Sequence, residues 1–522
     1  MAAIVTDQFR IQNAEAFVNS VNDDSNSYYV FLGLSNPGLP DKFGRLENWD
    51  ETSNAIIPSP VDNFSYLSHY RDTILFGKKI TGGNVRRVVK KITWTANTKY
   101  DMYRHDYDVN NLAQNSDSSR LYSSNFYVVN KDFRVYICLY NGSSGSNPKG
   151  ETSQDEPLFT DLEPSAAGNS NDGYIWKYLF TISPSDIIKF DSTEYIILPN
   201  DWATSTDFEI KSIRESGNST DNFNQIKIVY IKNSGNANYV SGSYPILGDG
   251  EGGEVQITAN SSGQIVSTKV INGGRGYTFG IVDLGSNSNI SQEDRAELIP
   301  IIPPSKGHGY DIYRELGADK VLIYSRFDTS IKEFSANTKF AQVGVIKNPE
   351  EQSSSNIFKG ATFSGLHSIK LEDTISVNPE IGGQLFQQRE SNESQNNVGW
   401  AAAFDPETNI LKYYQDRSLY LTNGLNNVDS NLIVDQGQVY PFESSDRRIT
   451  QANGFSGSVS IGFSGSTLDL GNSIVGLGVS FVDGLAKPEI NKSTGDIIYI
   501  DNRSIVSRSI RQKEDVKIIL EF

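Results

Sequence analysis

Apolar residues in this chain recur mostly in short continuous runs or at every second position, which is the pattern of β-strands. Four runs are apolar enough for strands buried on both faces of a sheet. They lie at residues 28–34, 126–129, 135–140 and 174–181. Between the last two, the polar stretch 141–173 is too long for a simple turn and predicts a surface excursion. Residues 516–522 alternate between apolar and polar side chains, which predicts a half-buried final strand. Its apolar face would consist of Val516, Ile518, Leu520 and Phe522.

Helix signals are few and short. Asn13 is placed to cap a helix whose apolar side chains follow the helical period over residues 14–21. Asp62 is placed to cap a second helix, which Gly77 would end. Residues 183–186 begin with Ser and Pro, which is a typical start for a short helix. The pattern as a whole therefore predicts a mainly β protein with a few short helices.

Residues 206–300 contain an internal repeat, in which a strand leads through Asn and Gly to a Tyr. The two copies lie at residues 228–239 and 270–277. Each copy predicts a strand, a tight turn and a Tyr packed over that turn. Two copies are too few for a solenoid. The stretch therefore predicts a small β module inserted into a larger framework.

Residues 356–490 form a second Gly- and Ser-rich stretch with short strand patterns. Residues 405–409 carry Asp, Pro and Asn between two of these patterns, which predicts a hairpin. We interpret the stretch as a second inserted β region. The strands expected within it include residues 400–404, 410–414 and 458–463.

Composition limits the partners and the location. The 522 residues include 63 acidic and 46 basic side chains, and the net charge of −17 disfavours binding to nucleic-acid phosphates. No apolar run approaches ~18 residues, so no membrane span is expected. Residues 1–7 lack the basic and apolar segments of a signal peptide. Cys138 is the only cysteine, which excludes an internal disulfide and favours assembly in a reducing cytosol. Its apolar strand predicts an inert thiol.

The segment Gly248–Gly253 matches the G-x-G-x-x-G pattern of dinucleotide-binding loops. That function needs a helix after the glycines, whereas Val255–Thr258 is strand-like. A hairpin turn is therefore the favoured interpretation. Asp249, Glu251 and Glu254 could offer carboxylates to calcium, but they lack the spacing of a calcium loop, so a solvated turn is favoured again.

No other residue pattern predicts a chemical site. His69, His105, His308 and His367 are dispersed without zinc-ligand spacing, and His69 is expected at the surface of its helix. The chain contains no G-x-S-x-G motif and no P-loop. We therefore assign no catalytic, cofactor-binding or metal-ligating residue, and we expect a protein that is not an enzyme.

Three passages of the chain are distinctive together. Residues 172–180 contain a D-G-Y-x-W-x-Y motif and are followed by residues 194–199, residues 497–503 close on residues 518–522, and residues 3–10 are followed by residues 29–33. All three resemble the gene-eight baseplate wedge protein family of T-even-type myoviruses, in the same order, and the first two are the most specific. Residues 340–349 resemble a fourth passage of that family, and residues 304–316 look like versions of it from phages of cyanobacteria.

The resemblance covers roughly residues 1–205, 301–350 and 491–522. It implies a layered β-sandwich framework formed by 1–205, 301–355 and 491–522, with 206–300 and 356–490 as two inserted small β domains. It also implies a homodimer that contacts other baseplate wedge proteins in the virion tail, after assembly in the host cytoplasm. It assigns no partner-interface residue and no cofactor.

A receptor- or glycan-binding tail protein is the alternative function. Such proteins more often show many β-helix coils or a trimeric stalk, and this chain has only a two-copy repeat. A secreted adhesin is disfavoured by the missing signal peptide. The expected function is therefore a structural role in a contractile-tail baseplate.

Overall fold

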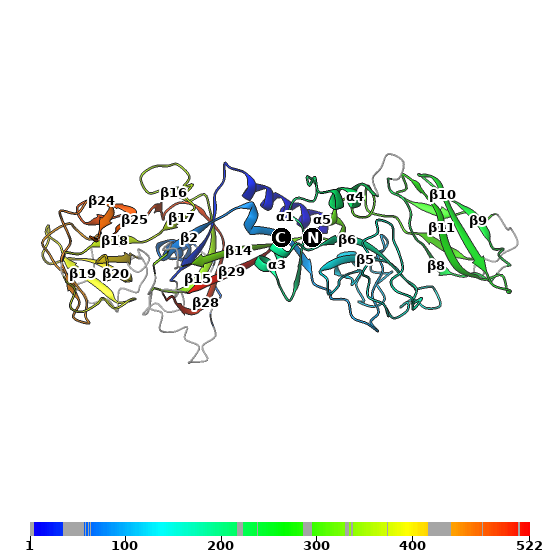
Figure 1. Ribbon diagram of the computed structural model, residues 1–522, viewed down its shortest axis with the longest axis horizontal. Coiled ribbons are helices and arrows are strands. Elements are labelled where there is room, and N and C mark those ends of the chain that lie inside the picture. Colours follow the sequence, from blue (N-terminus) through cyan, green and yellow to red (C-terminus); the bar gives the residue numbers. More distant parts are fainter. Residues whose placement is uncertain are drawn as a thin grey trace. The chain divides into compact units, whose positions relative to one another are not determined.

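The computed structural model in Figure 1 confirms a mainly β protein with several antiparallel sheets and a few short helices. Contacts divide the chain into two compact units. The first consists of Met1–Val18, Val85–Leu322 and Ile518–Phe522, and the second of Asn19–Asn84 and Ile323–Lys517. The structure describes residues 5–34, 57, 59–60, 62, 64–216, 223–236, 238–285, 295–328, 334–335, 338–372, 374–415, 440–471, 473–509 and 512–522.

The first unit contains two sheets in its framework. A three-stranded sheet has the order β4-β5-β6, and a four-stranded sheet has the order β29-β14-β3-β7, in which β14 and β29 continue into the second unit. The strands are β3 (Val85–Lys90), β4 (Tyr127–Val129), β5 (Arg134–Asn141), β6 (Tyr174–Thr181), β7 (Tyr195–Ile197), β14 (Lys320–Asp328) and β29 (Lys513–Glu521). The helices are α1 (Asp7–Asn22), which begins in this unit, η4 (Leu121–Ser123), α3 (Pro184–Phe190), α4 (Phe208–Ser216) and α5 (Ile312–Glu315).

The strands of residues 229–300, green in Figure 1, surround a hydrophobic cluster of their own. A four-stranded sheet, β11-β10-β9-β12, and a two-stranded sheet, β13-β8, lie with β12 beside β13 and β11 beside β8. The strands are β8 (Val229–Asn233), β9 (Gly242–Gly248), β10 (Glu251–Ala259), β11 (Ile265–Arg275), β12 (Gly280–Val282) and β13 (Glu297–Pro300). Buried Ile and Val side chains from both sheets fill the interior, as in a small barrel.

The two copies of the repeat contain the same local turn. The Asn233 side chain accepts a hydrogen bond from the N–H of Gly235, and Asn272 does the same with Gly274. Both glycines have a positive φ, +67° and +60°, which Gly adopts without a Cβ clash. The buried Tyr277 then donates its hydroxyl to the Ile246 carbonyl at 2.9 Å. The turn chemistry of the repeat is thus explained, while the predicted module boundaries stay predictions.

The second unit is built on two large sheets. One has the order β17-β2-β1-β15-β28, and the other has the order β23-β22-β19-β20-β21-β18-β26. The strands of the first are β1 (Tyr28–Gly33), β2 (Ile74–Ile80), β15 (Lys339–Lys347), β17 (Thr362–Ser364) and β28 (Asp496–Ser507). Those of the second are β18 (His367–Lys370), β19 (Gln384–Gln388), β20 (Asn396–Asp405), β21 (Ile410–Tyr414), β22 (Ile449–Thr450), β23 (Ser456–Gly457) and β26 (Leu485–Ala486).

The remaining elements of the second unit are short. Two strand pairs, β16-β27 and β24-β25, stand outside the large sheets. They are β16 (Glu350–Glu351) with β27 (Ile490–Asn491), and β24 (Gly465–Asp469) with β25 (Ile474–Phe481). The helices that lie wholly in the described part of this unit are α2 (Phe64–Asp72) and η3 (Gly82–Asn84).

Several sequence predictions are confirmed. All six residues of β1 are buried, as expected for a strand covered on both faces. The helix at residues 183–190 has Ser183 as its cap and Pro at its start. Strands β20 and β21 form the predicted hairpin, with Asp405 opposite Ile410. The final strand has Ile518 and Leu520 buried, and its polar partners are exposed.

Two helix boundaries were predicted wrongly. Asn13 lies inside α1, because Thr6 precedes the helix and accepts the N–H of Phe9 on its hydroxyl. Gly77 does not end α2. That helix stops at Asp72, where the Thr73 hydroxyl donates to the His69 carbonyl at 3.0 Å. The predicted cap at Asp62 stays a prediction, because residue 63, which joins Asp62 to the first residue of α2, lies outside the described residues.

Gly77 has a packing role instead. It lies in the middle of β2, where a Cβ would come within 2.2 Å of the Phe363 ring. The predicted strand at residues 458–463 is also wrong. Its chain turns, with the N–H of Phe463 bonded to the Ser460 carbonyl, and only Val459 makes an isolated bridge, to Leu371.

Candidate functional site

The D-G-Y start of β6 is a turn that fixes the polar excursion before it. The Asp172 carboxylate accepts the N–H of Tyr174 at 3.0 Å and the N–H of Gln154 at 2.8 Å. Gly173 between them has a φ of +83°, a left-handed conformation that favours glycine. This spacing of Asp, Gly and Tyr therefore ties the 141–173 stretch to the beginning of the strand.

Aromatic side chains then pack along β6. Tyr174 stacks on Trp176 with ring centroids 5.4 Å apart, and Tyr100 meets Trp176 edge-on at 5.8 Å. Tyr174, Trp176 and Tyr178 are all fully buried, as predicted. β6 is the last strand of its sheet. The excursion covers that edge, since Ser165 exchanges two backbone hydrogen bonds of 2.9 Å with Trp176.

Lys177 is a charged residue held inside this packed strand. Only 3% of the residue is exposed. Its Nζ donates to the Leu162 carbonyl at 2.7 Å and to the Ser216 hydroxyl at 3.4 Å. Burial lowers the pKa of Lys177 to about 8, because it penalises the ammonium form. The side chain thus joins β6, the excursion and the end of α4.

A buried histidine–glutamate pair lies beside Lys177. His308 Nδ1 is 2.6 Å from Glu315 Oε1, and the other carboxylate oxygen of Glu315 accepts the N–H of Gly309 at 2.7 Å. The His308 ring meets the Tyr103 ring edge-on at 4.8 Å. The helix that carries Glu315 is itself capped by Asp311, whose side chain accepts two backbone N–H groups. The pair thereby fastens the 307–309 turn to α5.

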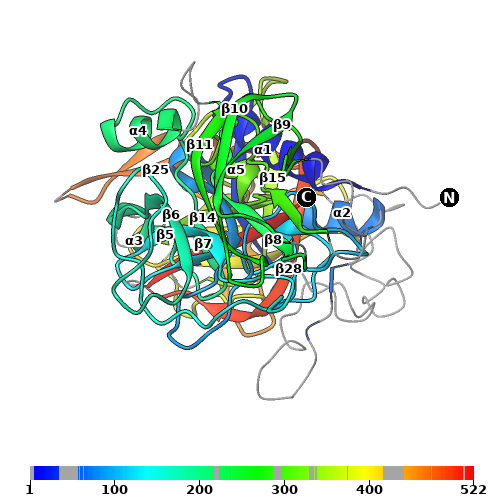
Figure 2. The same ribbon diagram turned by 90° about the vertical axis from the view of Figure 1, so that its right-hand side faces the viewer.

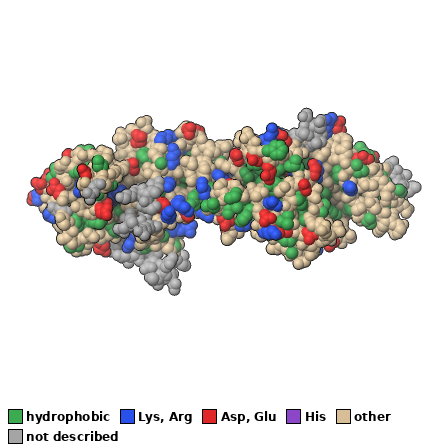
Figure 3. All heavy atoms as spheres, viewed as in Figure 1, with side chains coloured by type: hydrophobic (Ala, Val, Ile, Leu, Met, Phe, Trp, Pro, Cys, Tyr) green, Lys and Arg blue, Asp and Glu red, His purple; other side chains and the backbone are tan. Residues whose placement is uncertain are grey.

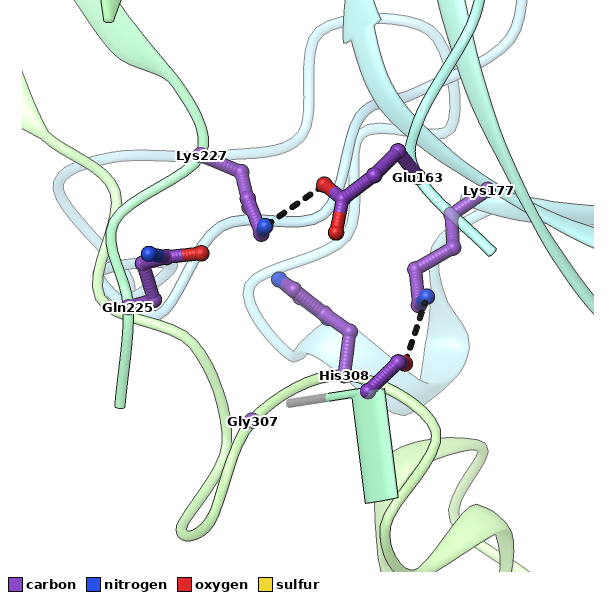
Figure 4. Close-up of a pocket in the computed structure, with 7 residues that line it drawn as sticks. Glu163, Lys177, Gln225, Lys227, Gly307 and His308 are labelled. Carbon is purple, nitrogen blue, oxygen red and sulfur yellow. Dashed lines mark hydrogen bonds and ion pairs between the residues drawn. The ribbon is translucent and has the colours of Figure 1, made fainter. Parts of the chain in front are cut away.

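Figure 4 shows the small pocket between these groups. Lys227 reaches Glu163 across it at 2.7 Å, while Lys177 points to the end of α4. The free volume is about 10 Å³, which is the space of one water molecule. A substrate does not fit in this space. The ion pairs and hydrogen bonds around the pocket can instead hold several segments of the chain together.

A second hollow of the first unit is larger but mixed in charge. It has a free volume of about 170 Å³ and lies among α1, β3 and the end of β29. Asp7 pairs with Arg120, and Lys320 pairs with Asp319 and Glu521 at 2.9 and 3.0 Å. Because acidic and basic side chains both line this hollow and pair with each other, the hollow favours neither a cationic nor an anionic ligand. Acidic and basic side chains are also interspersed on the face that Figure 3 shows.

The G-x-G-x-x-G segment forms the turn between β9 and β10, as the hairpin interpretation predicted. The Asp249 carboxylate is already hydrogen-bonded near this turn, because it accepts the N–H of Thr278 at 2.9 Å and that of Phe279 at 3.2 Å. Glu251 pairs with Arg275. Within the described ranges, no three His, Cys, Asp or Glu side chains are grouped so as to hold a metal ion.

The histidines lie apart from one another in different elements, but His69 was placed wrongly. It is fully buried rather than on the helix surface, because α2 packs this side of its last turn inward. Cys138 is buried in β5, and burial raises the pKa of its thiol well above the usual value, so the prediction of an inert thiol is supported.

Sequence reasoning missed the charged cluster around Lys177. A signal was present, because a lysine in the middle of an apolar strand is seldom buried without partners. The partners themselves could not be found from the pattern. Glu315 and His308 are distant in sequence, and Ser216 comes from a helix that the pattern did not predict.

No family model matches the chain. No helix among the described residues is long and apolar enough to cross a membrane. The chain is similar to the baseplate wedge protein gp8 of Enterobacteria phage T4, with 24% identity over 218 residues. The match covers 38% of this chain and 60% of the phage T4 protein, which is less than two thirds of that relative. This similarity supports a distant relationship between the two proteins.

Proposed function

We propose that this chain is a structural component of the baseplate wedge in a contractile-tailed phage, where it acts through contacts with other proteins. The similarity to the baseplate wedge protein gp8 of phage T4 carries the proposal. The passages at residues 172–180 and 497–503 support it as well, because they resemble the same family in the same order.

The geometry around β6 supports a mechanical role over a catalytic one. Lys177, Glu163 and Glu315 are engaged with neighbouring groups, and the space between them has room for one water. The buried His308–Glu315 pair and the buried Lys177 hold neighbouring segments in register, because loss of a partner would leave a buried polar or charged group unsatisfied. We therefore propose that the protein is not an enzyme and that it contributes stiffness to the particle.

The proposal includes a homodimer that joins the virion tail through other baseplate wedge proteins, after assembly in the host cytoplasm. Residues 206–300 and 356–490 would be insertions into the wedge framework, as in a version from a phage of cyanobacteria. A net charge of −17 opposes nonspecific association, so each of these contacts would need a specific surface.

The test is the location of the chain in the particle. Phage carrying the full-length protein with an epitope tag would be imaged by cryo-electron microscopy after labelling with a Fab fragment. We expect Fab density at the tail baseplate and tailless particles when the gene is interrupted. Density on the capsid or the tail fibres would refute the wedge assignment.

Light scattering tests the dimer separately. The purified full-length protein should show twice the mass of one chain at micromolar concentration. A monomer throughout that range would refute the free dimer and leave the wedge assignment standing. Release of reducing ends from host polysaccharide by the purified protein would instead favour the glycan-directed alternative.

A further inference from the structure

Strands β24 and β25 form a two-stranded ribbon, residues 465–481, that we call the arm. Within the described part of the chain they pair only with each other, with Leu468 opposite Val475 and Asp469 opposite Ile474. The base is anchored, because Val479 and Phe481 are buried in a small hydrophobic cluster. The rest projects from its unit, as the orange strands in Figure 2 show.

The arm has one apolar face that its unit covers only in part. Alternation along the paired strands places Leu468, Val475 and Leu477 on this face. All three are half-buried, and Leu477 packs against the hydrophobic cluster at the base of the arm. Toward the tip, Leu470 is 39% exposed, and Ile474 on the opposite face is 73% exposed.

Glycine positions show open space around the opposite face and the tip of the arm. A Cβ built on Gly465, Gly471, Gly476 or Gly478 would meet no described atom within 4 Å. An isolated two-stranded hairpin is marginally stable in water, and it normally needs a further strand or a packed face. The arm therefore presents apolar surface and open backbone to a neighbour that is not part of its own unit.

Charge indicates the chemistry of that neighbour. Asp469 is the only charged residue in positions 465–481, although charged residues make up 21% of the chain. Cores of protein interfaces are depleted of charge in the same way. Glycines also allow another backbone to approach closely. An apolar, uncharged protein surface is the occupant that matches these properties.

We propose that the arm docks into an apolar groove on a different protein of the same tail, and this rests on the proposed function. A second copy of this chain fits less well, because the two hollows described above are lined by charged side chains. An aliphatic ribbon would leave those charges without water or partners. The arm would thus connect this chain to a neighbour after each has folded.

Site-directed labelling can test this, because the chain has one native cysteine and that cysteine is buried. Ser473→Cys would place a thiol at the arm tip, and Ser391→Cys would place a matched thiol at an exposed position elsewhere in the unit. Both variants would be treated with a charged maleimide as purified full-length protein and within purified tails. Buried interface cores exclude water and therefore reagent.

We expect both thiols to react quickly in the free protein. In tails, Ser473→Cys should react roughly tenfold or more slowly while Ser391→Cys is unchanged, because only the arm tip is enclosed by the partner. Equal rates for both variants in tails would overturn the proposal. Absence of the wild-type chain from purified tails would overturn the proposed function instead.

Two further results would overturn the identity of the partner. Protection of Ser473→Cys in the free protein at micromolar concentration, lost on dilution, would show a second copy as the occupant. Protection by phosphatidylcholine vesicles would show a lipid surface.

A charge variant gives an independent readout. Gly476→Lys should leave the melting curve of the free protein unchanged and reduce its incorporation into tails, whereas the control Gly462→Lys, also in open space, should incorporate normally. Normal incorporation of Gly476→Lys would contradict docking through the arm.

Discussion

Strands β6 and β25 are both eight residues long and both mainly apolar, yet they have opposite environments. Six of the eight residues are buried in β6, and two of the eight are buried in β25. In β6, the polar excursion covers the strand edge and aromatic rings fill its faces. In β25, glycines alternate with aliphatic residues, and a Cβ on Gly476 or Gly478 would meet no described atom within 4 Å. Apolar content therefore predicts a strand, whereas its burial depends on what the rest of the chain brings to it.

The difference separates two mechanical roles. The β6 environment is complete within one unit, so its interactions stabilise the folded chain itself. The arm's apolar face is covered only in part by its own unit, and in the docking proposed above the remaining contacts contribute to assembly rather than to folding. Substitutions in the two strands should therefore affect different measurements, and the following predictions test this separation.

The largest effect is expected from Trp176→Ala in β6. Trp176 is fully buried and contacts the rings of Tyr174 and Tyr100. Removing a buried Trp side chain loses these contacts and opens a cavity, which lowers the free energy of unfolding by ~3–5 kcal/mol. Urea unfolding of the purified protein measures this change, and insoluble protein would agree with it. An unchanged melting curve would contradict the assigned role of β6. The matched control is Ile474→Ala in the arm, where we expect a change within ~0.5 kcal/mol.

The second effect is a pH dependence that originates at Lys177. Burial lowers its pKa from 10.5 to about 8. Between these values the unfolded chain binds more protons than the folded chain, so the free energy of unfolding should rise with pH. The slope is at most about 1.4 kcal/mol per pH unit, because one proton is involved. Below pH 8 both states are protonated, and the contribution of Lys177 is constant there.

Lys177→Met isolates this contribution. Urea unfolding of wild type and variant from about pH 7.5 to 9.5 stays below the range in which tyrosines ordinarily titrate. Above pH 8 the slope of the wild type should be more positive than that of the variant. The comparison with the variant is needed because Cys138 keeps its proton in the folded chain while the unfolded thiol titrates, which adds the same negative contribution to both slopes. Lys339→Met, at an exposed position, should keep the wild-type slope. Parallel curves for Lys177→Met and wild type would show that Lys177 is not held as an ammonium in a desolvated site.

Sequence patterns located β6 because period and composition agreed there. The continuous apolar run, the Gly before it and the aromatic residues all favoured one buried strand, and its bounds were predicted correctly at residues 174–181. The strand at 458–463 was misplaced because Ile461 and Phe463 lie in a turn, which the Phe463 N–H closes by bonding to the Ser460 carbonyl. The arm lies directly after this turn. Local patterns therefore find strands but do not show which neighbours pair with them.

The buried cluster was beyond local patterns for a different reason. Lys177 pairs with groups near residues 162 and 216, and Glu163 pairs with Lys227. Each partner stands in a polar stretch that resembles an ordinary solvated loop. Only the fold brings these stretches over β6, so the sequence predicted the strand and could not predict the charges around it. His69 was misplaced for a similar reason, since a short helix with few apolar residues does not show which side is covered.

The third prediction compares glycines in the two regions, beginning with Gly173→Ala beside β6. Gly173 has a φ of +83°, and a residue with a Cβ in this region is destabilised by roughly 1–2 kcal/mol. A shifted turn would also weaken the bond from the Tyr174 N–H to Asp172. We therefore expect a lower unfolding midpoint in urea with an unchanged slope. A midpoint equal to that of wild type would mean that the turn is not needed to hold the excursion.

The smallest effect on folding, and the sharpest test of the difference between the strands, is expected from Gly476→Thr in the arm. Gly476 lies opposite Thr467 in the ribbon, without a positive φ, and a Cβ there meets no described atom within 4 Å. A β-branched residue suits a strand better than Gly and reduces the entropy of the unfolded chain, so the variant should be neutral or more stable by about 0.5 kcal/mol. Its incorporation into tails should nevertheless fall, because the added side chain would separate the arm from an occupant that approaches the glycine backbone. Thermal unfolding of the free protein and quantitative blotting of purified tails measure the two effects on one sample. Loss of stability would place a hidden contact of the folded chain on the arm, and unchanged incorporation would show that this face of the arm is not in contact in the particle. Only a variant that folds as well as wild type and assembles worse separates a strand made for folding from one made for assembly.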